Sequence, residues 1–172
     1  MDSNAFNLAL DRWHDFYAAT AGASAALLGL LFVAVSIDLR GVSASERRLR
    51  RISARGAFAN LVFALALSLS ALIPGQSPRG VATWIGALGA LCLVRLSGRL
   101  VEVVRRREKL VWRLRALRRL MWSGLGGVTL MVVSVQLWIT GDPDWLYWLV
   151  TAMLAFLIAA ADTAWGISVD DD

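Results

Sequence analysis

Residues 16–37 carry no charged side chain, and this apolar run constrains the fold more than any other feature of the chain. Its length matches the roughly 20 apolar residues that an α-helix needs to cross the hydrocarbon core of a bilayer. Hydrophobic residues make up 58% of the 172 residues, more than the roughly 45–50% of an ordinary soluble domain. A soluble chain of this composition would expose large apolar patches, which soluble monomers rarely do. The sequence therefore predicts a membrane protein.

Four further apolar runs follow the first one. Clusters of proline and glycine at 74–80 and 141–143 are strong turn signals and predict tight hairpins between neighbouring runs. We therefore expect an all-α integral membrane helical bundle that forms a single domain over residues 1–172. Its five transmembrane helices are expected at about 16–39, 57–73, 81–97, 120–139 and 145–167.

The basic residues predict how these helices cross the membrane. Of the 18 lysines and arginines, six lie in residues 40–55 and nine in residues 99–119. Cytoplasmic loops of membrane proteins carry an excess of Lys and Arg. The basic connections 40–56 and 98–119 are therefore expected in the cytoplasm, which places the N-terminus outside and the C-terminus in the cytoplasm. The eight tryptophans lie near the predicted helix ends, as expected for aromatic belts at the membrane interfaces.

Small residues recur along one face of several predicted spans. Membrane helices associate where small residues let their backbones approach closely. We expect these stripes to pack the five helices together, and a subunit interface is their alternative use. The stripes are Ala21, Ala25 and Gly29 beside Ala18, Gly22 and Ala26 in the first span, Gly86 and Ala90 in the third, Ser123 and Gly127 in the fourth, and Ala152, Ala155, Ala159, Asp162 and Gly166 in the fifth.

The segment 98–119 contains no proline, and no glycine after Gly98, so it is expected to be helical. Two geometries fit its pattern of apolar and basic residues. It can lie in the interface as a basic amphipathic helix, or the third and fourth spans can project as a helical hairpin that turns near 107–109. We favour the hairpin, because Leu49 and Ile52 offer it an apolar partner on the extension of the second span.

The arginines of both basic segments are expected to contact anionic headgroups on the cytoplasmic side of the bilayer. Topology and lipid attraction account for the charge, and no nucleic-acid-binding signature accompanies it. Nucleic acid is therefore not expected as a partner. The arginines expected at the headgroups are Arg47, Arg48, Arg51, Arg105, Arg106, Arg113 and Arg118.

Two short stretches resemble a known group of proteins. Residues 16–36, with Gly22, Gly29 and the run 32–36 (FVAVS), look like the opening of small bacterial multi-pass membrane proteins of unassigned function. The run 72–76 (LIPGQ) is similar to the same group. The resemblance covers roughly residues 13–85. It implies a bacterial cytoplasmic (inner) membrane and brings no activity or site residue with it.

Asp162 is the main candidate for an intramembrane charge site, because an ionisable group inside a span is costly and marks function by default. Arg95 and Asp38 are the charged residues expected at a similar depth. An ion pair between Asp162 and Arg95 would hold the register of the bundle, although Arg95 can also snorkel to the headgroups. Alternatively, Asp162 would serve as a proton or cation site.

The remaining polar residues of the spans are expected to be structural. Asn60, Ser68, Ser70, Thr20, Ser24 and Ser36 can bond across helices or to their own backbone, and Cys92 is expected to be a small buried residue.

No catalytic motif, metal-ligand cluster or cofactor-binding motif occurs in the sequence. We therefore expect no enzyme, no cofactor and no metal, but a non-catalytic bundle that self-associates or binds a membrane partner. An oligomeric channel, or a small carrier that uses Asp162 as an ion or proton site, is the alternative.

Overall fold

The computed structural model describes residues 3–38, 44–105 and 110–169, and this part of the chain is helical with short connections. Five of its helices are long and apolar enough to cross a membrane. The expectation of an all-α bundle with five such helices is therefore confirmed. The elements are α1 (Ser3–Arg12), α2 (His14–Asp38), α3 (Ala44–Ala71), α4 (Pro78–Arg105), α5 (Leu110–Thr140), the 3₁₀ helix η1 (Pro143–Tyr147) and α6 (Trp148–Val169).

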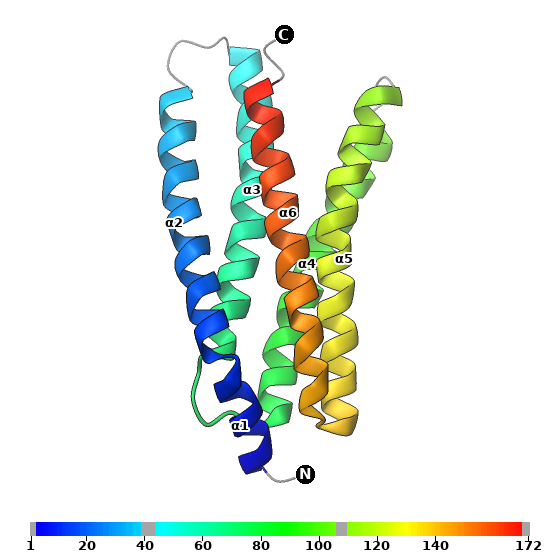
Figure 1. Cartoon of the computed structure of the whole chain (residues 1–172). Helices are drawn as coiled ribbons and strands as arrows, with labels where there is room; N and C mark the ends of the chain where they lie inside the picture. The colour runs from blue at the N-terminus through cyan, green and yellow to red at the C-terminus, as the bar shows by residue number, and fades with distance from the viewer. Residues whose placement is uncertain (1–2, 39–43, 106–109, 170–172) are drawn as a thin grey trace.

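The long helices run up and down along one another (Figure 1). We call the end at which α2, α4 and α6 finish the basic end, because the arginine-rich segments of the sequence adjoin it. We call the opposite end, where the connections 72–77 and 141–142 lie, the turn end. Helices α2, α3 and α6 lie together, whereas the hairpin of α4 and α5 leans away from α3 towards the basic end (Figure 1).

Helix α4 continues to Arg105 and α5 begins at Leu110, so both spans extend into the segment 98–119 as one helical hairpin. The alternative of an amphipathic helix that lies across the membrane interface is therefore wrong. The physical reason is that α4 and α5 each continue as one unbroken helix from the span into the extension, so the segment does not turn to lie across the interface. The turn expected near 107–109, and the side chains of Leu49 and Ile52, lie outside the described residues.

Both tight turns depend on a glycine with a left-handed backbone. Gly75 has φ +69° and Gly141 has φ +64°, a conformation that side chains disfavour. After α3, the Gln76 side chain donates a hydrogen bond of 2.6 Å from Nε2 to the backbone carbonyl of Ser70. This carbonyl lies in the last turn of α3 and has no partner further along the helix. After α5, Asp142 accepts a hydrogen bond from the Asp144 amide and caps η1. These contacts turn the chain back without a long loop.

Helix α1 was not expected from the sequence. Its residues Phe6 and Leu10 are buried at the turn end, where α1 contacts η1. The two residues lie four apart and therefore share one face of a helix. This spacing is the signal in the sequence that indicates α1, and it is weak because the segment is short and polar.

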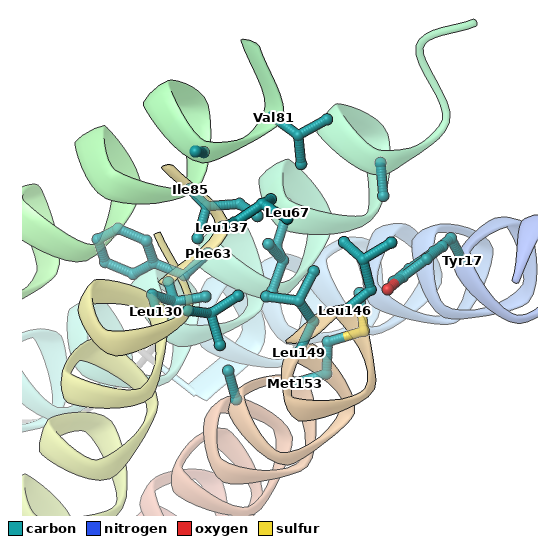
Figure 2. Close-up of a cluster of buried hydrophobic side chains, with 14 of the residues drawn as sticks. Tyr17, Phe63, Leu67, Val81, Ile85, Leu130, Leu137, Leu146, Leu149 and Met153 are labelled. Carbon is teal, nitrogen blue, oxygen red and sulfur yellow. The ribbon is translucent and has the colours of Figure 1, made fainter. Parts of the chain in front are cut away.

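The main core lies towards the turn end and joins every long helix (Figure 2). Leu67 of α3, Ile85 of α4, Leu130 of α5 and Leu149 of α6 are almost completely buried there. Phe63 of α3 stacks on Phe156 of α6 with the ring centroids 5.5 Å apart. Large apolar side chains from every long helix thus pack together near the turn end.

Most of the small-residue stripes pack the bundle as predicted. The prediction is wrong for Ala90 of α4, which is exposed, because the face of α4 that packs on α5 includes Gly86 and Gly89 instead. Ala152, Ala155 and Ala159 of α6 are buried. A Cβ on Gly86 of α4 would lie 2.5 Å from Ser134 Oγ of α5, so these two helices approach closely at this glycine.

The stripe of α2 is a further exception. Ala21 is buried, but Gly22, Ala25 and Gly29 are exposed. The prediction that these three residues pack the bundle is therefore wrong within one chain. The physical reason is that the face with Tyr17, Ala21 and Ser24 is the one that is buried, which turns the glycines outward.

Candidate functional site

Asp162 is half-buried on α6, directly before the buried Thr163. Helices α3, α4 and α6 meet at this level. A Cβ on Gly56 of α3 would lie 3.3 Å from Nη1 of Arg99 and 3.4 Å from Cγ2 of Thr163. The basic side chain that reaches the junction of α3 and α6 is therefore Arg99 of α4. Sequence analysis had named Arg95, one helical turn earlier.

Arg95 is exposed on α4 and binds α3. Its Nη2 donates a hydrogen bond of 3.0 Å to the backbone carbonyl of Arg55. The structure thus brings Arg95 to Arg55 and leaves a pairing with Asp162 as a prediction.

The other residues named from the sequence lie at the basic end. Asp38 is the last residue of α2. Arg106 lies outside the described residues, and so do the side chains of the remaining six arginines and of Asp38. By backbone position, Arg47, Arg48 and Arg51 belong to α3, Arg105 ends α4, and Arg113 and Arg118 belong to α5.

Two polar side chains link α3 to α5 inside the bundle. Ser123 Oγ donates to Asn60 Oδ1 at 3.0 Å, and Asn60 is 7% exposed. Cys92 is buried beside this pair and donates from Sγ to the Ser123 carbonyl at 3.6 Å. The structural roles expected for Asn60 and Cys92 are therefore confirmed. Several hydroxyls bond instead to the carbonyls of their own helix, namely those of Thr20, Ser36, Ser68, Ser70 and Thr163. The expectation is wrong for Ser24, whose buried hydroxyl has no partner in the described part of the chain.

A groove of about 600 Å³ lies between α2, α3 and α4 in the half of the bundle near the basic end. Its apolar walls include Phe32 of α2, Phe58 of α3 and Leu91 of α4. Its lining includes two charged residues, Arg55 and Arg95. We call this space the arginine groove. Its complete lining is Leu31, Phe32, Val35, Ala54, Arg55, Phe58, Ala59, Val62, Phe63, Ala66, Leu88, Leu91 and Arg95.

Sequence analysis did not single out Arg55, because it counted this residue with the basic connection 40–56. A signal for it exists nevertheless. Arg55, Phe58 and Val62 are spaced three and four residues apart, so they share one face of α3. Leu88, Leu91 and Arg95 repeat this spacing on α4. Arg55 thus lies at one end of an apolar stripe on α3, and Arg95 lies at one end of an apolar stripe on α4. This pattern indicates a charged group at the edge of an apolar surface.

The outward face of α2 is the second candidate site. A Cβ on either Gly22 or Gly29 would meet nothing within 4 Å, and Ala18, Ala25 and Ala26 are also exposed. We call these five residues the small face of α2. In the most apolar stretch of His14–Ile37, 11% of the residues are buried, against 61% in Ala54–Ala71 of α3. Helix α2 therefore has most of its surface available for contacts outside the chain.

In the described part of the chain, no group of three or more His, Cys, Asp or Glu side chains is placed to hold a metal ion. The arginine groove offers apolar walls and guanidinium groups to a ligand. The small face of α2 offers exposed small residues to another helix. Comparison of the chain with protein-family models, with curated proteins and with solved structures found no match. The resemblance to small bacterial membrane proteins stays a prediction.

Proposed function

We propose that this protein is a non-catalytic integral membrane protein that self-associates through the small face of α2. The proposed location is the cytoplasmic (inner) membrane of a bacterium. The five long helices would cross it with the N-terminus outside and the C-terminus in the cytoplasm. The basic end would then lie in the cytoplasm, in agreement with the tendency of arginine-rich connections to stay on that side.

Exposed tryptophans support this placement. Trp84, Trp138 and Trp148 are between 54% and 58% exposed, and all three lie towards the turn end. Indole rings prefer the headgroup level of a bilayer. A belt of exposed indoles at one end of an apolar bundle is therefore expected where that end meets a membrane surface.

The observation that carries self-association is the exposure of the small face. Lipid tails pack well against large apolar side chains, and the outward face of α5 carries such side chains along its length. Helix α2 has large exposed apolar side chains only in its second half, from Leu27 onwards. Its first half exposes glycine and alanine instead. The large exposed residues of α5 are Leu125, Val128, Val132, Val135 and Ile139.

A second copy of this chain is the occupant that the small face fits best. The face contains the spacings of four residues from Ala18 to Gly22 to Ala26 and from Ala25 to Gly29. Two helices with this small-xxx-small spacing pack against each other because their backbones approach closely. A two-fold interface uses the same patch on both subunits, so one self-complementary stripe is sufficient for it.

Native mass spectrometry of the protein in mild detergent tests this proposal. We expect a dimer for the wild type and a monomer for the double variant Gly22→Leu/Gly29→Leu, because the added side chains separate the helices. Gly98→Leu is the matched control, because a Cβ there also meets nothing within 4 Å and Gly98 lies on another helix. The control is expected to remain dimeric.

A disulfide crosslink between two copies carrying Ala26→Cys, formed in native membranes on a Cys92→Ala background, would confirm the interface before extraction. The proposal would be overturned if the wild type stayed monomeric in detergent and the Ala26→Cys variant did not crosslink. It would equally be overturned if the double variant dimerised like the wild type.

A further inference from the structure

The arginine groove is long and narrow. On α3 it extends from Ala54 to Ala66, a distance of about 18 Å at 1.5 Å per residue. On α4 it extends from Leu88 to Arg95. Because α3 and α4 are antiparallel, Arg55 and Arg95 both lie at the end of the groove nearest the basic end. The groove thus combines an apolar channel with one cationic end.

The two arginines are held together at that end. The hydrogen bond from Arg95 to the Arg55 carbonyl bridges α4 and α3 and places the Arg95 guanidinium beside Arg55. The lining of the groove includes no acidic residue. The Arg55 side chain makes no hydrogen bond or ion pair with any other residue in the described part of the chain. Two positive charges therefore adjoin the groove without a carboxylate of the described chain to neutralise them.

The chemistry of the groove selects its occupant. Guanidinium groups bind phosphate through paired N–H donors, and basic pockets between transmembrane helices on the cytoplasmic side bind acidic lipid headgroups. The apolar walls select a hydrocarbon chain. A single acyl chain is the apolar group that a bilayer supplies.

We propose that the arginine groove binds one anionic phospholipid, with its phosphate between Arg55 and Arg95 and an acyl chain along Phe32, Phe58 and Leu91. This binding rests on the membrane location in the proposed function, but not on self-association. The phosphate of the bound lipid would bridge both guanidinium groups with its single negative charge, and the lipid would fill the gap that opens between α2 and α4 over α3. It differs from the general attraction of the arginine-rich segments to headgroups, because one lipid occupies one defined position.

Native mass spectrometry with added lipid tests the proposal. The probe is phosphatidylglycerol, and phosphatidylcholine with the same acyl chains is the comparison. We expect one phosphatidylglycerol to bind at least tenfold more tightly than phosphatidylcholine. The double variant Arg55→Gln/Arg95→Gln should lose about tenfold or more of this affinity, because each charge-assisted hydrogen bond contributes substantially to binding.

Two further variants separate the groove from general charge effects. Arg47→Gln/Arg48→Gln removes the same net charge from the basic end and should leave the first, tightest phosphatidylglycerol in place. Val62→Trp keeps both arginines but fills the groove with a larger side chain at a residue that is 42% exposed. It should weaken binding of that same lipid. Circular dichroism of each variant checks that the helices are retained.

Three results would overturn the proposal. The first is equal binding of the two lipids. The second is an equal loss of affinity in the Arg55/Arg95 and Arg47/Arg48 variants. The third is displacement of phosphatidylglycerol by glycerol phosphate at equal concentration, which would indicate a phosphate site without a chain site. The same spectra report the oligomeric state, and the Arg55→Gln/Arg95→Gln variant is expected to remain dimeric. A failure of lipid binding is thereby distinguished from a failure of self-association.

Discussion

Two buried hydroxyls on α2 are the most unusual single residues of the bundle. Tyr17 and Ser24 are fully buried, and their hydroxyl oxygens have no hydrogen-bond partner in the described part of the chain. A buried polar group without a partner costs about 1–3 kcal/mol of stability. The ring of Tyr17 belongs to the main core (Figure 2). The ring is therefore expected to stabilise the fold while its hydroxyl does not.

We predict that Tyr17→Phe leaves the free energy of unfolding unchanged or raises it by about 1 kcal/mol, because it removes only the hydroxyl. Tyr17→Ala should lower the free energy of unfolding by about 3–5 kcal/mol, as expected for the loss of a buried ring. Denaturant titration in mild detergent measures both changes. Tyr147→Phe is the control, because Tyr147 is 67% exposed. A loss of stability in Tyr17→Phe like that of Tyr17→Ala would contradict this account.

For the charged residues, the sequence predicts the position along each helix but not the direction of each side chain. Position along each long helix was predictable, and it correctly grouped Arg95 with the half of the bundle near the basic end. The direction of a side chain depends on how each helix is rotated, and the sequence alone does not determine rotation. Arg95 consequently binds Arg55, while Arg99 reaches Gly56 and Thr163.

At the scale of elements, the contact between α3 and α5 depends on one polar pair. The hydrogen bond from Ser123 to Asn60 joins two helices that are distant in the sequence. In a bilayer such bonds contribute about 0.6 kcal/mol on average, because the separated helices also find partners. The bond therefore specifies which faces meet more than it stabilises the bundle.

We predict a coupling energy of about 0.6 kcal/mol between Asn60→Ala and Ser123→Ala in a double-mutant cycle. Thermal unfolding in detergent micelles measures the three variants against the wild type. Ser97→Ala is the control, because the Ser97 hydroxyl is exposed and bonds to Val94 of its own helix. A coupling energy near zero would show that this hydrogen bond is not maintained in the folded protein.

The spacing of small residues predicts the packing face of some helices but not of others. Alanines on α6 and Gly86 on α4 pack between helices as their spacing predicted. On α2 small residues occur almost all round the helix from Ala18 to Gly29. No single face is then preferred, so the pattern cannot distinguish contact within the chain from contact with a second chain. In the folded chain, the face with Ala21 and Ser24 packs inside the bundle, and the face with Gly22 and Gly29 points outward.

At the scale of the whole molecule, the number and order of the long helices followed from the sequence. Apolar length, two proline–glycine turns and the absence of helix breakers in residues 99–119 are strong local signals. The groove between α2, α3 and α4 was not predicted, because it arises where α4 and α5 lean away from α3 (Figure 1). Such tilts result from the summed packing of all helices, which no local pattern encodes.

The bundle is proposed to span the membrane with its basic end in the cytoplasm, and both proposed binding sites depend on this orientation. Labelling of single cysteines with a membrane-impermeant maleimide tests this most directly. Each cysteine is introduced on a Cys92→Ala background in intact spheroplasts. Ser77→Cys and Asp144→Cys report on the turn end, and Gly41→Cys and Glu108→Cys report on the basic connections.

We predict that Ser77→Cys and Asp144→Cys react in intact spheroplasts, whereas Gly41→Cys and Glu108→Cys react only after the membrane is permeabilised. Reaction of all four cysteines without permeabilisation, or the reverse pattern, would contradict the account.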